Sequence, residues 1–147
     1  MDADTFFTLE QQEKIVAAIK EAEKNTSGEI RVHVEKKCAY DVRKRAAKVF
    51  TKLKMHKTEL RNGILFYIAT ESHTFFLAGD KGIHEKVGQD FWEKVKDKTI
   101  AHFKEGKIAE GLAEAILECG DQLKKHFPYN SATDTNELSD EISFNNN

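Results

Sequence analysis

The chain has 147 residues, with 23 Lys and Arg against 25 Asp and Glu and a hydrophobic fraction of 39%. This length suits one domain, and the composition excludes a collagen-like repeat, a disulfide scaffold and a membrane span. The net charge of −2 identifies no class of partner. The acidic start Met1-Asp2-Ala3-Asp4 lacks the basic region and apolar run of a secretory signal, and no later apolar stretch approaches membrane-spanning length, so we expect a cytoplasmic protein with no membrane insertion. We also expect a monomer.

The first half of the chain predicts two helices separated by a strand. Thr8 and Gln11 have the spacing of a capping box at the start of a helix, which ends at Asn25-Thr26-Ser27-Gly28. The segment Glu29–Glu35 then alternates apolar and polar residues, which predicts a strand with one wetter face. Asp41 is expected to cap the second helix, whose Arg45 should point into solvent.

The second half predicts a hairpin followed by two helices. The apolar run 64–69 is typical of a central strand covered on both faces, and the segment 74–78 should pair with it. Helices are expected from Asp90 and after Gly106. The order is α-β-α-β-β-α-α, with the first two strands parallel and the third antiparallel to the second. The sequence therefore predicts an α/β fold in which helices flank a small mixed β-sheet.

The only proline, Pro128, divides the chain into a folded domain, 1–128, and a tail, 129–147. Proline disfavours helical backbone at the residue that precedes it, so the preceding helix is expected to end at this boundary. The tail holds four acidic residues and no Lys or Arg, so we predict that it is a disordered acidic C-terminal tail.

The predicted topology places three turns at one end of the sheet: those before the first and second strands and the one after the third. Carboxylates concentrate in these turns and just beyond them, at Glu29, Glu59, Asp80, Glu85 and Asp90. Clustered carboxylates repel one another, and a cation, a lysine or bulk water must lower the cost.

Three sequence motifs are expected at this end of the sheet: Thr26-Ser27-Gly28-Glu29-Ile30, Arg61-Asn62-Gly63-Ile64-Leu65 and Gly79-Asp80-Lys81-Gly82-Ile83-His84-Glu85. In order and spacing, over residues 7–128, they resemble the TPM domain family, including a soluble bacterial subgroup of the Bacteroidetes type. The resemblance implies an α/β/α sandwich and an acidic crevice that holds divalent cations. It also implies phosphatase activity in the plant thylakoid branch and accessory roles at membrane complexes in others. Two positions depart from the family pattern: Arg61 replaces an acidic residue, and His84 is inserted before Glu85.

Each candidate metal ligand also has a structural interpretation. Asp80 is either a ligand or a turn aspartate, and Glu85 is either a ligand or a solvated helix residue. Asp90 is better explained as a helix cap. Because Ca²⁺ or Mg²⁺ requires about six oxygen ligands, these carboxylates predict a weak site.

Other reactive residue types lack a chemical signature. The six histidines form no metalloprotease pair and are expected on the surface, and Cys119 falls on the apolar stripe of the last helix. A basic face on the second helix and beyond could meet phosphates, but no stacking residues interleave with it, so we expect a solvated face and no nucleic-acid partner. Its members are Arg43, Lys44, Arg45, Lys48, Lys52, Lys54 and Lys57.

Three functional hypotheses follow. The first is a binding module that holds Ca²⁺ or Mg²⁺ in a crevice around Asp80, Glu85 and Asp90, with Glu29 and Glu59 nearby. The second is a metal-assisted phosphatase in which Arg61 or Lys81 steadies the anion, although no catalytic nucleophile or base is identified. The third is a protein-interaction module that recruits a partner through the basic helix and the acidic tail.

Overall fold

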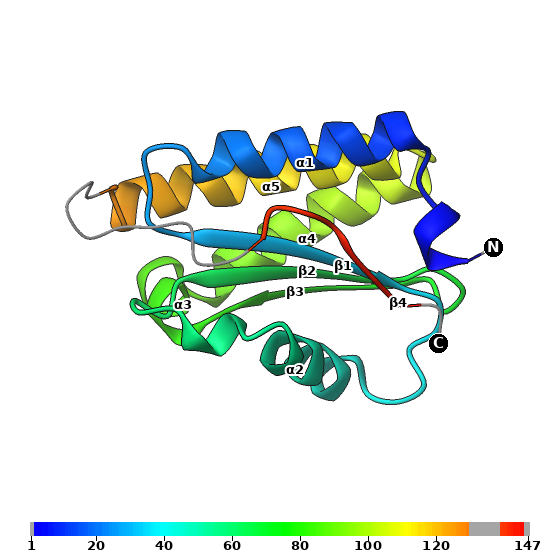
Figure 1. The fold of residues 1–147 in the computed structure, drawn as a ribbon, viewed down its shortest axis with the longest axis horizontal. Coiled ribbons are helices and arrows are strands. Elements are labelled where there is room, and N and C mark those ends of the chain that lie inside the picture. Colours follow the sequence, from blue (N-terminus) through cyan, green and yellow to red (C-terminus); the bar gives the residue numbers. More distant parts are fainter. Residues whose placement is uncertain (1, 130–138, 146–147) are drawn as a thin grey trace.

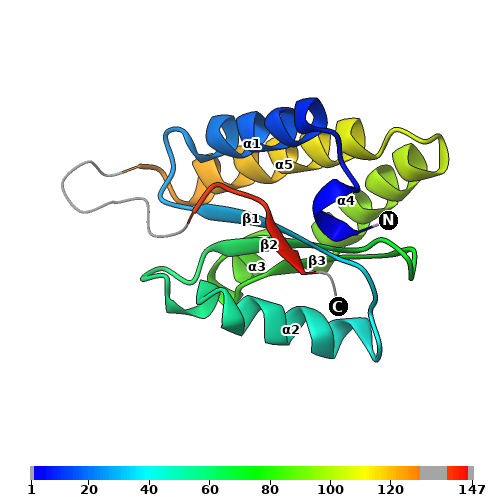
Figure 2. The same cartoon turned by 45° about the vertical axis from the view of Figure 1, so that its right-hand side comes forward.

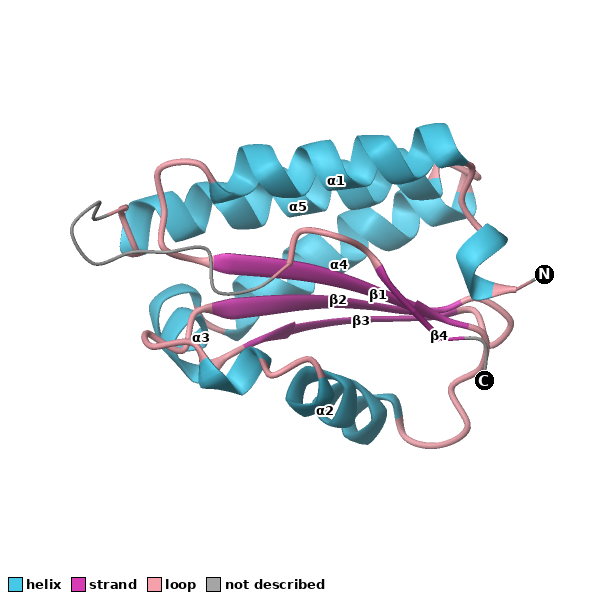
Figure 3. Ribbon diagram, viewed as in Figure 1, coloured by secondary structure: helices cyan, strands magenta, loops and turns pink. Residues whose placement is uncertain are grey.

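Helices cover both faces of one mixed sheet in the computed structural model, which describes residues 2–129 and 139–145 (Figure 1). Figure 3 shows α1, α4 and α5 on one side of the sheet and α2 on the other. The elements in chain order are η1 (Ala3–Thr5), α1 (Leu9–Glu23), β1 (Glu29–Glu35), α2 (Val42–Lys52), η2 (Met55–Lys57), β2 (Gly63–Ala69), β3 (Thr74–Gly79), α3 (Lys81–Val87), α4 (Gln89–Lys104), α5 (Ile108–His126) and β4 (Ser143–Asn145), where η marks a 3-10 helix.

The order of the strands in the sheet is β3-β2-β1-β4. β1 and β2 are parallel and β3 is antiparallel to β2, which confirms the predicted topology. Glu29 lies opposite Gly63, and Ile64 lies opposite Gly79. The starts of β1 and β2 and the finish of β3 therefore share one end of the sheet, here called the acidic end.

β2 is the centre of the core, and all seven of its residues are buried. Alternate side chains of the strand belong to two clusters, because successive residues point to opposite faces. Ile64, Phe66 and Ile68 pack in the large cluster with α1, α4 and α5, whereas Leu65 and Tyr67 pack in the smaller cluster under α2. This double coverage explains the uninterrupted apolar run.

The second face of β1 is not the wetter face that alternation predicted. His33 and Glu35 lie on it and are buried, at 5% and 0% exposure. The prediction was wrong because alternation shows which residues are polar but not whether they are exposed. Here a residue of α2 pairs with the buried charge, so the polar face of the strand can be covered.

The predicted helix starts are confirmed at two positions and wrong at a third. Thr8 and Gln11 form a reciprocal capping box, and the Asp41 carboxylate accepts a hydrogen bond from Arg43 N. Asp90, in contrast, lies in the first turn of α4, where Gly88 occupies the cap position. The short helix α3, with Asp80 as its cap, was not predicted.

The C-terminal segment departs from the predicted disorder. Ser143–Asn145 form β4, which pairs in parallel with β1, while residues 130–138 lie outside the described part of the chain. Figures 1 and 2 show the segment running between α1 and the sheet before it joins β1. Ile142 and Phe144 pack against the large core cluster, so apolar burial holds this segment in place despite its acidic composition.

Candidate functional site

At the acidic end, Asp80 is only 8% exposed and both of its carboxylate oxygens are engaged. Arg61 Nε donates to Oδ2 at 2.7 Å and Arg61 Nη2 donates to Oδ1 at 2.9 Å. Oδ1 also accepts a hydrogen bond from Lys81 N at 2.8 Å, which caps α3. Asp80 is thus a turn and capping residue in this state, and the two residues predicted to act separately, as ligand and anion binder, form one ion pair.

The other predicted residues are dispersed. Glu59, Glu85, Asp90 and Lys81 are exposed, whereas Glu29 is buried at 2% exposure. Within residues 2–129 and 139–145, no group of three or more His, Cys, Asp or Glu side chains is arranged to hold a metal ion. The structure therefore brings Glu29 and Asp80 to one end of the sheet but does not assemble the five predicted carboxylates into a ready-made site.

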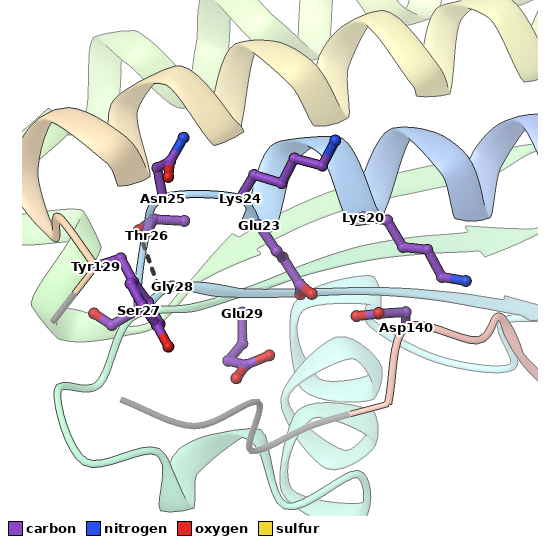
Figure 4. A pocket seen from close by; sticks show the side chains of 10 residues that line it. All are labelled: Lys20, Glu23, Lys24, Asn25, Thr26, Ser27, Gly28, Glu29, Tyr129 and Asp140. Atoms are coloured by element: carbon purple, nitrogen blue, oxygen red, sulfur yellow. Dashed lines mark hydrogen bonds between the residues drawn. The ribbon is translucent and has the colours of Figure 1, made fainter. Parts of the chain in front are cut away.

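A pocket of about 420 Å³ opens beside Glu29, at the start of β1. It lies between the end of α1, the turn that follows it and the returning C-terminal segment. Figure 4 shows the carboxylates of Glu23 and Asp140 turned toward each other, whereas the Glu29 side chain is directed away from that pair. Its lining residues are Lys20, Glu23, Lys24, Asn25, Thr26, Ser27, Gly28, Glu29, Tyr129 and Asp140.

Glu23 is the most strongly perturbed acid of this pocket. Burial, a hydrogen bond with Asp140 and the nearby negative charge of Glu29 raise the pKa of Glu23 to about 10, although a hydrogen bond from the Ile30 N–H opposes the shift. That N–H donates to Glu23 Oε2 at 2.9 Å. At neutral pH the Glu23 carboxyl therefore keeps its proton, which relieves the repulsion between the acids.

Two buried oxygens near this pocket have unused capacity. Among the described residues, Asp140 Oδ1 and Asn62 Oδ1 have no hydrogen-bond partner. The Asn62 amide nitrogen donates to Ser27 Oγ at 3.3 Å, which places the Asn62 side chain next to the turn that lines the pocket. Carboxylate and amide oxygens are the donor types that hard cations prefer, and these two oxygens are unengaged in the described part of the chain, whereas the carboxylate of Asp80 is engaged.

Sequence reasoning missed Glu23 and Asp140. Glu23 is the last residue of α1 and carries no motif, and Asp140 belongs to the segment predicted to be disordered. The sequence held a signal for Glu23 only. Its predicted helix ends shortly before the strand that begins at Glu29, so the end of that helix had to lie near the acidic end.

A second polar cluster lies under α2, toward the other end of β1. Arg45 Nε donates to Glu35 Oε2 at 2.7 Å and Arg45 Nη2 donates to Oε1 at 2.6 Å, while Tyr67 OH also donates to Glu35. His33 lies 3.0 Å from Glu35 Oε1 and 2.9 Å from Ser143 Oγ. Arg45 is therefore not a solvent-facing member of the basic face, and His33 is not a surface histidine.

The charge of Glu35 is stabilised where it is buried. Burial would raise the pKa of Glu35, but hydrogen bonds from Arg45, His33 and Tyr67 outweigh it and lower the pKa to about 2. We interpret this cluster as structural, because its hydrogen bonds join α2 and β4 to β1. Cys119 is fully buried, and burial raises the pKa of its thiol, as a core residue requires.

No helix in the described ranges has the length and apolar character needed to cross a bilayer. The chain matches the family model of the TPM domain over residues 1–122. Among solved structures it is similar to the BA42 protein of the psychrophilic bacterium Bizionia argentinensis, with 46% identity, a TM-score of 0.88 and 97% of each chain covered. The N-terminal domain of a protein from P. gingivalis shares the fold at 17% identity and a TM-score of 0.70, covering 86% of this chain and 83% of that one. A comparison with curated proteins gave no match.

Proposed function

This chain belongs to the TPM domain family, and from that premise we propose that it is a binding module for a divalent cation, Ca²⁺ or Mg²⁺, at the acidic end of its sheet. The observation that supports the proposal is that three carboxylates, Glu23, Glu29 and Asp140, line one pocket, although they are not arranged as a ready-made metal site. Each comes from a different segment, namely α1, β1 and the C-terminal return.

A cation would replace the proton that now relieves the repulsion between these acids. Glu29 and Asp140 would supply carboxylate oxygens, Glu23 would contribute once its proton leaves, and Asn62 would offer its amide oxygen. Ca²⁺ and Mg²⁺ take about six or more oxygens, so water must complete the shell and the affinity should be modest.

The carboxylates predicted on the β3 side have a lesser part in this proposal. Asp80 becomes available only if Arg61 releases it. Glu59, Glu85 and Asp90 are exposed, and we assign them the role of a negative field that raises the local concentration of cations.

The phosphatase alternative depends on the same cation together with Arg61 and Lys81 as anion binders. The guanidinium of Arg61 is neutralised by two hydrogen bonds with Asp80, which makes it a poor receptor for a phosphoryl group. The residues at the acidic end therefore favour binding of a cation over hydrolysis of a phosphomonoester.

An NMR titration of the full chain with CaCl₂ and with MgCl₂ tests the proposal. We expect amide shifts in residues 25–30 and 139–141, and a loss of at least about tenfold in affinity in Glu29→Gln and in Asp140→Asn. Glu85→Gln is the matched control, since it removes one exposed carboxylate of the same end that contributes only to the negative field, and it should weaken binding far less than tenfold.

Two results would contradict the proposal. One is the absence of any shift up to about 10 mM cation, well above the weak end of natural calcium sites. The other is a set of shifts confined to residues 79–90 and abolished by Glu85→Gln, which would move the site to the β3–α3 turn.

A further inference from the structure

β3 forms one edge of the sheet, and no strand within the described ranges lies beyond it. Its sequence, Thr74-Phe75-Phe76-Leu77-Ala78-Gly79, contains no charge and no proline. Proteins commonly protect an edge strand with a lysine, a proline, a bulge or a covering element, because its unpaired backbone groups can template another chain. The side chains of β3 provide none of these protective residues.

The hydrogen-bonding pattern between β2 and β3 shows which backbone groups of β3 have no partner in β2. Asp80 N donates to Gly63 O at 2.9 Å, which makes this a hydrogen-bonded pair, and such pairs recur at every second residue of an antiparallel ladder. The N–H and C=O groups of Phe75, Leu77 and Gly79 therefore point away from β2. Within the described part of the chain, no other hydrogen bond engages them.

A pocket of about 740 Å³ runs along this edge. α2 and α4 both contact β3, and residues of both helices line this pocket, so the open edge lies in a slot between them. Val42 and Phe76 line the α2 wall, and Phe75 and Trp92 line the α4 wall. The slot thus presents apolar surface on both sides of a row of unused backbone groups.

The charge of the slot selects an acidic occupant. Arg43 and Lys96 line it together with Glu93, and Glu93 is already paired with Lys96 at 2.9 Å. Arg43 forms no ion pair among the described residues, although it lies near enough to Glu93 to add to the hydrogen bond from Lys96 in lowering the pKa of that carboxyl. Two cations against one carboxylate leave the slot with a net positive charge. A second copy of the chain is a poor partner. A symmetric pairing of two β3 strands would bring the two positively charged Arg43 side chains close together, and they would repel each other.

We propose that the β3 edge binds an extended acidic segment of a partner protein by strand addition. The segment pairs its backbone with Phe75, Leu77 and Gly79, directs carboxylates toward Arg43 and packs apolar side chains against Trp92. Backbone pairing gives affinity in this mode of recognition, and the alternate side chains give specificity. The surface lies at the opposite edge of the sheet from β4, so it is independent of the proposed cation pocket.

The test uses an eight-residue peptide of alternating valine and glutamate, blocked at both ends, with the full-length protein. Trp92 is the only tryptophan, so its fluorescence reports occupation of the slot directly. We expect saturable changes in Trp92 emission, and NMR shifts and slowed amide exchange at Phe75, Leu77 and Gly79. An alternating valine and lysine peptide should not bind.

Two controls separate strand addition from simple charge attraction. N-methylation of alternate peptide nitrogens should weaken binding by at least about tenfold in one of the two registers and leave the other unchanged, because only one set of N–H groups faces β3. Arg43→Glu should weaken binding by at least about tenfold, whereas Lys44→Glu, the neighbouring exposed cation outside the slot, should not.

Three results would overturn the proposal. The first is no response of Trp92 or of the three amides at about 1 mM peptide, which corresponds to the weakest affinity that recognition of this kind would need. The second is equal binding of both N-methylated peptides. The third is a dimer in sedimentation experiments that protects the three amides and excludes the peptide, which would make a second copy the occupant.

Discussion

The guanidinium of Arg61 makes two hydrogen bonds with the carboxylate of Asp80, at 2.7 and 2.9 Å, and so joins the start of β2 to the end of β3. Arg61 adopts a left-handed backbone conformation, with φ of 53°, in the turn before β2. Because the same carboxylate caps α3, the ion pair fixes the turn, the strand and the helix to one another. It also withdraws Asp80 from the set of available cation ligands.

Replacement Arg61→Asn should release that carboxylate. Asparagine tolerates positive φ better than most residues, so the turn should keep its conformation. We expect calcium affinity to rise by up to about tenfold, since a positive charge is lost and a carboxylate is freed at the same end of the sheet, and calcium-induced NMR shifts to spread to residues 79–81.

The control for this prediction is Lys81→Gln, which removes an adjacent positive charge and leaves the Arg61–Asp80 pair intact. An equal gain of affinity in both variants would mean that charge alone governs binding and that Asp80 is not a ligand.

Cation binding should depend on pH through Glu23. The pKa of this carboxyl is raised to about 10, chiefly by burial, so the cation must displace a proton at neutral pH. Affinity should therefore rise with pH between about 6 and about 9, with close to one proton released for each cation bound. Calorimetry in two buffers of different ionisation enthalpy measures that proton. A proton count that is the same in Glu23→Gln as in the wild type would refute the assignment.

Without a cation, the same residue should make the fold less stable as pH rises. The folded-state pKa of Glu23 lies above its unfolded value of 4.5, so its contribution to the free energy of unfolding is complete below about 4.5 and is lost as pH rises toward about 10. Urea unfolding at several pH values should show this loss, and Glu23→Gln should reduce it. Added calcium should flatten the profile if it replaces the proton.

The Glu35–Arg45 pair should have the opposite effect on stability, because its contribution to the free energy of unfolding is lost as pH falls. Burial is outweighed by hydrogen bonds, so the pKa of Glu35 is lowered to about 2, and the stability it contributes is present above about 4.5 and lost as pH falls toward 2. The Arg45 side chain is 19% exposed and that of Glu35 is fully buried. Arg45→Met would leave this carboxylate without its cation, and we expect a loss of about 3–5 kcal/mol in urea unfolding.

The double variant Glu35→Gln with Arg45→Met serves as the comparison. It should recover part of the loss, because a neutral amide costs less to bury than an unpaired carboxylate. If the double variant were less stable than Arg45→Met alone, the buried charge would not be the cause.

Local patterns were enough to predict most of the fold. The alternation of β1, the apolar run of β2 and the capping box at Thr8 each depend on residues close together in the sequence. The strand directions followed from the connections, which are a helix between β1 and β2 and a short link between β2 and β3. β4 could not be predicted in the same way. It is three residues long, it belongs to a segment of acidic composition, and its side-chain bond between Ser143 and His33 joins positions 110 residues apart.

The candidate site shows the same limit. Spacing alone placed Glu29 and Asp80 at one end of the sheet, and the ladder confirms it. Spacing could not reveal that Asp80 would pair with Arg61, because the pair depends on side-chain directions across two strands. Nor could it reveal Asp140, which reaches the pocket only because apolar packing of Phe144 brings the C-terminal segment back to the sheet.

Gly82 gives the most direct test of how the acidic end is built. A Cβ at this position would lie 2.3 Å from Leu60 O and 2.6 Å from Arg61 O, both backbone atoms, and Gly82 N already donates to Arg61 O at 2.8 Å. Gly82→Ala should therefore push α3 away from the turn before β2, with a cost of about 1–3 kcal/mol in urea unfolding. Lys81→Ala, an exposed change in the same helical turn, is the control and should cost little. Since the displacement would also separate Arg61 from Asp80, NMR shifts at both residues should accompany the loss in Gly82→Ala, and a variant as stable as Lys81→Ala would show that α3 is not held by this contact.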